Sequence, residues 1–321
     1  MILVGDIGGT KTVLEAGRLQ EGRWLPAFGA RYAAADHGGF ESVLRQFIGE
    51  WSLQDPRHAP VTAACFGVAG PVADNRAQMT NLPWIIDGAA ISRSFAIPRV
   101  NVINDFAAAA HGIALLLPAD LAVVQAGAPI ARAPRLVIGA GTGLGVAHLL
   151  WADGAYRVVA GEAGHGGFAP TNAEQVELWR SVHAQCGRVT IEHIVSGPGL
   201  TRIYKFVDRD AVARGVDVTP AAIVARALEA GDAASLRALD LFIACYGEAA
   251  GNLALSVIAR GGVYIAGGIA PKIFRRIAQG GFISAFNAKG SHSAVVQQMP
   301  VTVVLNERLG TLGCALVATM D

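Results

Sequence analysis

The sequence predicts an α/β chain with two domains. Its 321 residues are enough for two domains of ordinary size, each with its own core. Short apolar runs rich in β-branched residues alternate with longer segments in which apolar residues recur at helical spacing. A strand, a glycine turn that carries a threonine and a second strand occur at the N-terminus and again near residue 140. This repetition predicts a duplicated unit whose halves face each other across a cleft.

The first copy of this unit opens the chain. Residues 1–4 form a short apolar run typical of a buried strand, and residues 12–18 continue as a second strand after the turn Gly8-Gly9. Adjacent glycines permit positive φ and carry no Cβ atoms, so backbone amides can surround an oxyanion. Thr10 adds a hydroxyl donor, and Asp6 places a carboxylate beside the same point. A carboxylate next to bound phosphate requires a cation between them, so the pattern indicates a magnesium-nucleotide; an ordinary hairpin is the alternative.

The second copy runs from Leu136 to Ala147, with the turn Gly141-Thr142-Gly143 between its strands. Its glycines alternate with a period of two. The GxGxxG pattern of a dinucleotide fold has a different spacing and leads into a helix, whereas residues 145–151 are typical of a strand. The pattern therefore favours a second phosphate-binding hairpin.

Composition excludes several classes of function. A formal net charge of +1, with 16% charged residues, gives no basic surface for nucleic acid or an acidic membrane. No apolar stretch approaches the roughly 20 residues that cross a bilayer, and the chain start lacks a secretory signal, so we expect a cytoplasmic protein. Partners should be small molecules or copies of the same chain. The cysteines stand singly, without a Cys-x-x-Cys pair, and each is expected to be a small buried hydrophobe. They are Cys65, Cys186, Cys245 and Cys314.

Periodicity and turn signals predict the remaining elements. Further strands are expected at 27–35, 61–68, 100–105, 121–124, 156–160, 262–266 and 301–305. Helices are expected at 40–51, 91–95, 106–117, 173–186, 200–207, 219–230, 233–258, 271–278 and 310–320. We place the first domain at 1–110 and the second at 111–305, with the final helix, within 306–321, packing back on the first domain.

Polar residues stand where predicted strands end. Asn104 and Asp105 close the strand at 100–105, and ligands of parallel sheets bind at the carboxyl ends of strands. An amide and a carboxylate at that point suit hydroxyl recognition and proton removal; the alternative is that Asp105 only caps the next helix. In the loop at 79–84, Asn81 and Trp84 either cap and cover the core, or supply an amide donor and an apolar wall to a sugar.

The second half of the chain also contains candidate ligand-binding residues. Glu162 and His165 lie in a glycine-rich loop and indicate either a polyol clamp or a solvated surface loop; a metal site would need more ligands. Glu192 fits an ordinary first-turn acid that the helix dipole favours. Ser196-Gly197 at a helix start suits an anion or ribose, and Gly267-Gly268 after a strand exposes backbone to a ligand such as adenine.

Together these motifs resemble the bacterial glucokinase family. The matching segments run along the whole chain in the family's order: 3–10, 103–106, 139–145, 161–165, 196–200 and 266–268. The resemblance implies the fold of sugar kinases, heat-shock proteins and actin, a two-lobed actin-like ATPase (ribonuclease H-like) fold with a mixed sheet in each lobe and the active site in the cleft. It also implies phosphorylation of glucose at O6 with ATP and Mg²⁺, by a cytoplasmic homodimer, at the entry to glycolysis.

The resemblance assigns roles to individual residues. Asp105 matches the catalytic base, and the sugar contacts are Asn104, Glu162, His165 and Glu192, with Asn81 as a further candidate. The nucleotide contacts are Gly5, Asp6, Ile7, Gly8, Gly9, Thr10, Gly141, Thr142, Gly143, Ser196, Gly197, Gly267 and Gly268. Asp6 is expected to hold Mg²⁺ indirectly.

Two further features bear on the comparison with related sugar kinases. Lys11 stands where the family usually has Asn, which is similar to the ROK sugar kinases and affects the detail of the phosphate loop. The cysteine-rich zinc motif of ROK proteins is absent from 166–170, and because the phosphate loop stands at the start of the sequence we expect no DNA-binding head. Three alternatives stay open: a kinase for another hexose or an N-acetylhexosamine, polyphosphate as the donor, and a non-metabolic actin-like ATPase. The last would not need Asn104, Asp105, Glu162 and His165 together.

Overall fold

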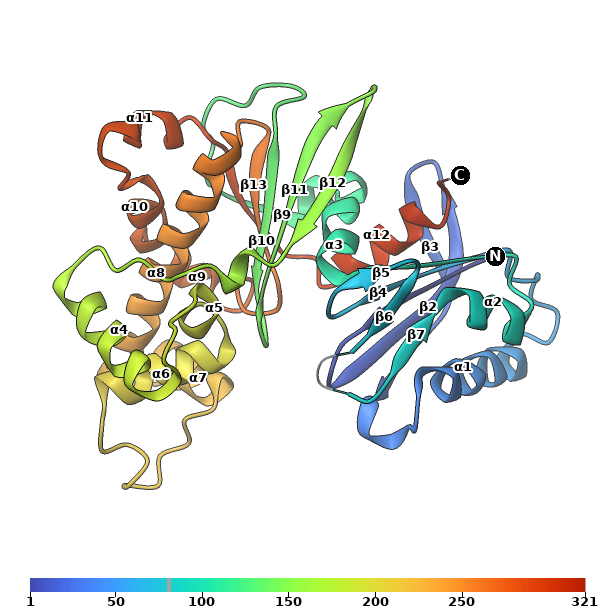
Figure 1. The fold of residues 1–321 in the computed structure, drawn as a ribbon, viewed down its shortest axis with the longest axis horizontal. Helices are drawn as coiled ribbons and strands as arrows, with labels where there is room; N and C mark the ends of the chain where they lie inside the picture. The colour runs from blue at the N-terminus through green and yellow to red at the C-terminus, as the bar shows by residue number, and fades with distance from the viewer. Residues whose placement is uncertain (80–81, 321) are drawn as a thin grey trace. The chain divides into compact units, whose positions relative to one another are not determined.

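The computed structural model describes residues 1–79 and 82–320. Backbone contacts divide the chain into two compact units (Figure 1). The first unit comprises Met1–Pro118 and Asn306–Asp321, and the second comprises Ala119–Leu305. The segment that ends the chain thus belongs to the same unit as the segment that starts it.

The first unit is built on a mixed five-stranded sheet in the order β3-β2-β1-β4-β8. Strands β3, β2 and β1 pair antiparallel, whereas β1, β4 and β8 pair parallel. Every residue of β4 is buried, as expected for a continuous apolar run with packing on both faces. The strands are β1 (Ile2–Ile7), β2 (Lys11–Gln20), β3 (Arg23–Ala33), β4 (Ala63–Val68) and β8 (Arg99–Asn104).

Helices cover both faces of this sheet (Figure 1). Helix α1 (Phe40–Gln54) packs its apolar stripe on one face, in a core with Leu3, Leu14 and Phe66. Helices α3 (Asp105–Gly112) and α12 (Leu309–Val317) pack together on the other face. A Cβ atom on Gly313 would lie 1.7 Å from the Ala108 carbonyl oxygen, so only glycine permits the close crossing of these two helices.

The segment between β4 and β8 holds a small sheet that the sequence did not predict and the short helix that it predicted at 91–95. A small antiparallel sheet forms from β5 (Val72–Ala73), β6 (Arg76–Gln78) and β7 (Ile85–Asp87), followed by α2 (Gly88–Phe95). Trp84 is buried in the core of the first unit, so it covers that core and is not a wall for a sugar. Asn81 lies outside the described residues.

The second unit repeats the arrangement of the first. Its six-stranded sheet has the order β12-β11-β10-β13-β14-β9. Strands β12, β11 and β10 pair antiparallel, and β10, β13 and β14 pair parallel, which is the same pairing as in β3-β2-β1-β4-β8. The strands are β9 (Leu121–Gln125), β10 (Arg135–Ala140), β11 (Leu144–Ala152), β12 (Ala155–Gly161), β13 (Gly262–Ala266) and β14 (Val301–Val304). The glycine hairpins therefore occupy equivalent positions in two sheets of like topology.

The helices of the second unit surround a long buried helix, α8 (Ala233–Val257), which packs against β10. The others are α4 (Ala173–Cys186), α5 (Ile191–Ile194), α6 (Gly197–Val207), α7 (Pro220–Leu228), α9 (Phe274–Ile277), α10 (Gly281–Asn287) and α11 (Ser293–Val296). The expected helix at 271–278 is only the single turn α9, and α10 and α11 were not predicted because the glycines around them obscure the period. Cys186 is exposed, so its predicted burial is wrong; the other three cysteines are buried.

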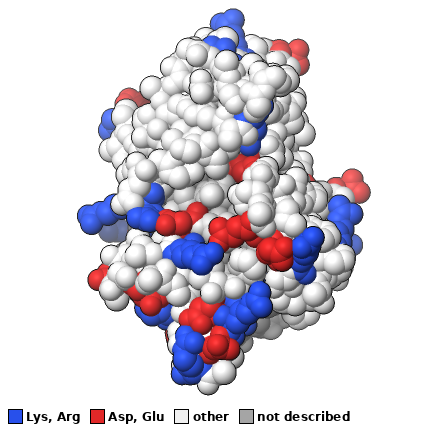
Figure 2. Space-filling model, turned by 90° about the vertical axis from the view of Figure 1, so that its left-hand side faces the viewer, with Lys and Arg blue, Asp and Glu red and all other residues white. Residues whose placement is uncertain are grey.

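Charged residues form no field of one sign on the face shown in Figure 2, where basic and acidic side chains alternate. Among the described residues, none of the helices combines the length and the apolar character that a membrane span requires.

Candidate active site

The first glycine hairpin joins β1 to β2 as predicted. The Gly8 amide donates to the Lys11 carbonyl oxygen at 3.0 Å, and the Ala34 amide donates to the Thr10 carbonyl oxygen at 3.0 Å. Gly9 is half-buried and Thr10 is exposed, so the tip of the turn is accessible. Two predicted nucleotide contacts, Gly5 and Ile7, instead lie buried beneath this tip. The Ile7 side chain belongs to the core, and a Cβ atom on Gly5 would lie 2.6 Å from Leu14. These two residues support the hairpin from below.

Asp6 lies on the face of the sheet that packs against α12. It pairs with Val13 across β1 and β2, so Lys11, two residues from Val13 on the same strand, projects from the same face. A Cβ atom on Gly310, in the first turn of α12, would lie 3.6 Å from the Asp6 carboxyl group. Burial among these groups raises the pKa of Asp6, and the charge of Lys11 acts in the opposite direction. Asp6, Lys11 and the start of α12 therefore form one charged position beside the hairpin.

Asn104 and Asp105 lie at the junction of β8 and α3. Asn104 is the N-cap: its Oδ1 accepts from the amides of Phe106 at 2.9 Å and Ala107 at 3.1 Å, and its Nδ2 donates to the Gly70 carbonyl oxygen at 3.1 Å. The alternative that Asp105 is the cap is therefore wrong, because Asp105 is the first residue of the helix. Its Oδ1 accepts from the Phe106 amide at 2.8 Å, and the residue is half-buried. The capping residue thus fixes the backbone that carries the predicted base.

A glycine in β4 lets this junction pack closely on the sheet. A Cβ atom on Gly67 would lie 3.1 Å from the Cβ of Ala108 and 3.6 Å from the Cα of Asp105. A larger residue at this position would displace the first turn of α3. This contact could not be predicted from local patterns, because Gly67 is distant from Asp105 along the chain.

The second glycine hairpin joins β10 to β11, as predicted. The Gly141 amide donates to the Gly143 carbonyl oxygen at 2.8 Å within the turn. Thr142 is exposed at its tip, and Gly141 and Gly143 are half-buried. The Gly197 amide, at the start of α6, donates to the Gly141 carbonyl oxygen at 2.8 Å. Two segments far apart in the sequence therefore meet at this turn.

Glu192 contacts the same hairpin from α5. Its Oε2 accepts from the Leu144 amide at 2.8 Å, and a Cβ atom on Gly143 would lie 2.5 Å from this oxygen. Glu192 is in the first turn of its helix, but its carboxylate binds a hairpin and is not simply a solvated first-turn acid. This contact could not be read from the sequence.

Glu162 and His165 follow β12 and lie close together. The distance from His165 Nε2 to Glu162 Oε2 is 3.9 Å, and the two side chains are 60% and 61% exposed. The intervening Gly164 lies against β11, where its Cβ would be 2.3 Å from the Leu144 carbonyl oxygen. The pair is therefore held beside the second hairpin and is open enough to meet a ligand.

The two remaining predicted loops differ in exposure. Ser196 is 1% exposed; its hydroxyl donates to the Glu192 carbonyl oxygen at 2.7 Å and accepts from the Gly199 amide at 3.1 Å. The expected ligand contact of Ser196 and Gly197 is thus not supported, since their polar groups serve the fold. Gly267 has a φ of +81°, and its Cβ would lie 2.5 Å from the Ala140 carbonyl oxygen, which requires glycine. Gly268 beside it is exposed.

Two supporting residues escaped sequence reasoning. The buried Tyr246 of α8 accepts from the Ala140 amide at 3.1 Å, directly before the second turn. Burial raises the pKa of Tyr246 well above its usual range, so its hydroxyl stays protonated. In the first unit, Glu15 accepts from Trp24 at 2.6 Å and Arg308 at 2.5 Å. In the sequence, both residues are polar groups within largely apolar elements, Tyr246 in α8 and Glu15 in β2. This position was the only local sign of their role.

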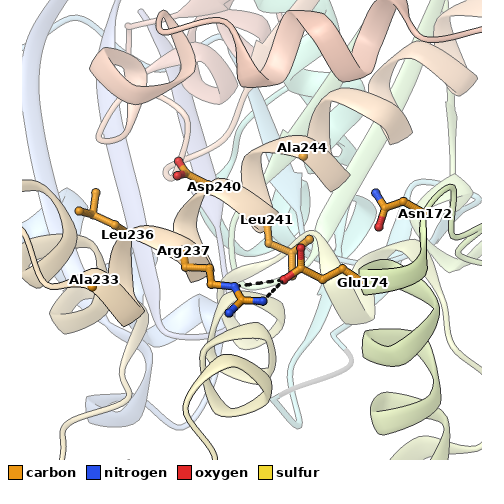
Figure 3. A pocket seen from close by; sticks show the side chains of 8 residues that line it. All are labelled: Asn172, Glu174, Ala233, Leu236, Arg237, Asp240, Leu241 and Ala244. Atoms are coloured by element: carbon orange, nitrogen blue, oxygen red, sulfur yellow. Dashed lines mark hydrogen bonds and ion pairs between the residues drawn. The ribbon is translucent and has the colours of Figure 1, made fainter.

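A cavity of about 540 Å³ lies elsewhere in the second unit, between the start of α4 and α8 (Figure 3). Arg237 donates to Glu174 across it at 2.8 Å, and the Asn172 side chain caps α4. None of its lining residues was predicted to be functional. Among the described residues, no cluster of three or more His, Cys, Asp or Glu side chains is arranged to hold a metal ion.

The glucokinase family profile matches residues 3–321. The glucokinase of Nostoc punctiforme is 37% identical, covering 99% of this chain and 98% of the relative, and that of Cronobacter sakazakii is 35% identical, covering 97% and 94%. Among solved structures, a glucokinase from an Antarctic psychrotroph aligns with a TM-score of 0.83 at 29% identity, covering 99% of this chain and 98% of that one. A ROK family glucokinase from Streptomyces griseus, in complex with glucose and AMPPNP, shares the fold with a TM-score of 0.68 at 22% identity, covering 99% and 98%. The predicted two-lobed actin-like fold class is confirmed, and the chain belongs to the glucokinase family, as an ATP-dependent sugar kinase.

Proposed function

We propose that this protein transfers the γ-phosphate of ATP to O6 of glucose, giving glucose 6-phosphate and ADP. The observation that carries the residue assignment is the junction of β8 and α3. There Asn104 caps the helix and fixes the Asp105 backbone at the carboxyl end of a parallel strand. A general base needs a defined position more than an unusual pKa, and this junction supplies one.

Asp105 is the proposed base. As O6 attacks the γ-phosphorus, the bond from phosphorus to the bridging oxygen of ADP breaks, and the O6 proton passes to the Asp105 carboxylate. ADP leaves with the bonding electron pair. Phosphoryl transfer involves little covalent chemistry by the protein, so positioning and charge stabilisation make up most of catalysis.

The proposed sugar contacts come from both units. Asn104 has one amide hydrogen engaged with Gly70, and the second suits a sugar hydroxyl. Glu162 and His165 are exposed side chains, and their groups suit accepting from and donating to sugar hydroxyls. Glu192 contributes through a carboxylate already fixed at one oxygen, and Asn81 stays a candidate from the sequence alone.

The proposed nucleotide contacts are the two hairpin tips, Gly8 to Thr10 and Gly141 to Gly143, with Gly267 and Gly268 beside the adenosine. The donor set fits Mg²⁺ bound with ATP, because that ion keeps waters and phosphate oxygens and takes one or two carboxylates from a protein. Asp6 is the residue that would hold it, through water. When bound, Mg²⁺ neutralises charge on the transferring phosphates. Lys11 adds a cation on the same face as Asp6.

The remaining expectations are proposals of the same kind. The predicted domains, 1–110 with the C-terminal helix and 111–305, differ at one boundary from the compact units, the first of which extends to Pro118. The protein acts as a cytoplasmic homodimer at the entry to glycolysis, without a membrane or nucleic-acid partner.

A substrate panel tests this function. ADP release from ATP is measured with glucose, mannose, fructose, N-acetylglucosamine and no sugar, in the presence of Mg²⁺. We expect release to depend on glucose. Greater release with another sugar would assign that hexose or N-acetylhexosamine instead. Equal release with and without sugar would indicate a non-metabolic ATPase.

A further inference from the structure

The geometry points to a second role for Glu192: it positions the phosphate-binding hairpin at 141–143 and so raises the affinity for ATP, in addition to contacting sugar. This inference rests on the proposed function, because it assigns the hairpin to the nucleotide. It concerns one unit of the chain only, and every contact that carries it lies between residues of that unit.

The two oxygens of the Glu192 carboxylate lie in different surroundings. Oε2 accepts from the Leu144 amide at 2.8 Å and would be 2.5 Å from a Cβ atom on Gly143. Oε1 is farther from that same point, at 3.9 Å. A hydrogen bond to an ionised acceptor is stronger than a neutral one, so Oε2 fixes the end of the turn firmly. Oε1 is the oxygen directed away from the hairpin.

The turn is held at both ends by one short segment. Glu192 binds Leu144 after the turn, and the Gly197 amide binds the Gly141 carbonyl oxygen before it, at 2.8 Å. Ser196 joins these two supports, since its hydroxyl donates to the Glu192 carbonyl oxygen at 2.7 Å. The segment 192–197 therefore forms a rigid support under the glycine turn. A glycine turn without such support would lose conformational entropy on binding phosphate.

The loop with Glu162 and His165 is connected to the residue directly before this segment. The Ile191 amide donates to the Gly166 carbonyl oxygen at 2.9 Å, and Gly164 lies against the Leu144 carbonyl oxygen. Glu162 itself has no hydrogen bond to the hairpin among the interactions described for residues 1–79 and 82–320. Both acids are proposed to contact sugar, but only Glu192 accepts a hydrogen bond from the hairpin. Glu162 therefore serves as the matched control.

The test measures the affinity for ATP with Mg²⁺ and without sugar, by isothermal titration, for the wild-type protein and three variants. Glu192→Ala should bind ATP about 10-fold to 100-fold more weakly, the effect of losing a hydrogen bond to a charged group. Glu192→Gln keeps an acceptor oxygen for Leu144 and should restore the affinity to within about 3-fold. Glu162→Ala should bind ATP as the wild type does, while both alanine variants lose affinity for glucose.

Unchanged ATP affinity in Glu192→Ala would overturn the inference and leave Glu192 as a sugar ligand only. If Glu192→Ala does not fold, as judged by its thermal transition, Gly143→Ala replaces it, because the added Cβ must displace the Glu192 carboxylate. Wild-type affinity in Gly143→Ala would equally overturn it. The ATP affinity is measured without sugar, so it tests the role of Glu192 independently of sugar phosphorylation. If the protein binds ATP but phosphorylates no sugar, the proposed function is refuted, and the affinities of the variants still test this inference.

Discussion

Arg308 donates a hydrogen bond of 2.5 Å to the Glu15 carboxylate, which joins the residue before α12 to the middle of β2. Glu15 is only 8% exposed, and the same oxygen accepts from Trp24 at 2.6 Å. Removing one partner of a buried charge leaves the other incompletely satisfied. The pair therefore fixes the start of α12, where Gly310 lies beside Asp6.

Arg308→Ala should lower the free energy of unfolding by about 1 to 3 kcal/mol, because Glu15 loses a charged donor in a buried position. Urea unfolding followed by circular dichroism measures the change. Arg45→Ala is the control, since it breaks an exposed pair with Glu41 that contributes at most about 0.5 kcal/mol. Equal losses in the two variants would show that burial of Glu15 does not matter.

Asp105→Asn should reduce turnover about 100-fold to 10,000-fold, because the variant cannot accept the O6 proton. The amide keeps the shape of the side chain, so the affinity for glucose should change little. Steady-state ADP release gives turnover, and titration with glucose gives affinity. Turnover equal to that of the wild type would dismiss Asp105 as the base.

Asn104→Ala removes the N-cap of α3 and should cost about 1 kcal/mol of stability, while also lowering turnover because the Asp105 backbone is no longer fixed. Asp87→Ala is a matched variant: Asp87 caps α2 through the Ala90 amide at 2.9 Å and is not among the proposed site residues. Both variants should unfold at similarly reduced urea concentrations. If turnover falls equally in both, the loss reflects stability and not positioning.

Asp6→Asn should stabilise the protein without ligand near pH 7, although it should weaken catalysis. Burial raises the pKa of Asp6 above its ordinary value of 3.8, so the folded chain binds this proton more tightly than the unfolded chain. The contribution of Asp6 is thus favourable below about pH 4 and is lost as pH rises through the raised pKa. The gain in melting temperature of the variant should be largest at pH 7 and should shrink as the pH is lowered toward 4.

Glu50, in the same unit, should show the opposite dependence of stability on pH. Hydrogen bonds from Tyr32 and Gln46 lower the pKa of Glu50, so its charged form stabilises the fold above its ordinary pKa. Glu50→Gln should therefore melt at a lower temperature than the wild type at pH 7, with a difference that decreases toward acid pH. A lower melting temperature for Asp6→Asn at pH 7 would contradict the assigned effect of burial.

The sequence by itself determined the features that depend on local order along the chain. The two glycine hairpins, helix α4 at 173–186 and strand β13 at 262–266 occur where periodicity and turn residues placed them. Their signals are local, because side-chain period and glycine turns act within a few residues. The order of the motifs was also sufficient to indicate the family.

Only the tertiary structure decided which of these segments meet. The strands β5, β6 and β7 are too short to show a period, and the equivalent pairing of the two sheets involves strands that are distant in the sequence. Ser196 is a polar residue at a helix start and was therefore expected to contact a ligand. Packing instead buries it as the N-cap of α6. The bond from Leu144 to Glu192 spans 48 positions and arises because α5 packs on the hairpin. Such contacts follow from the global packing of apolar faces, which a local pattern does not specify.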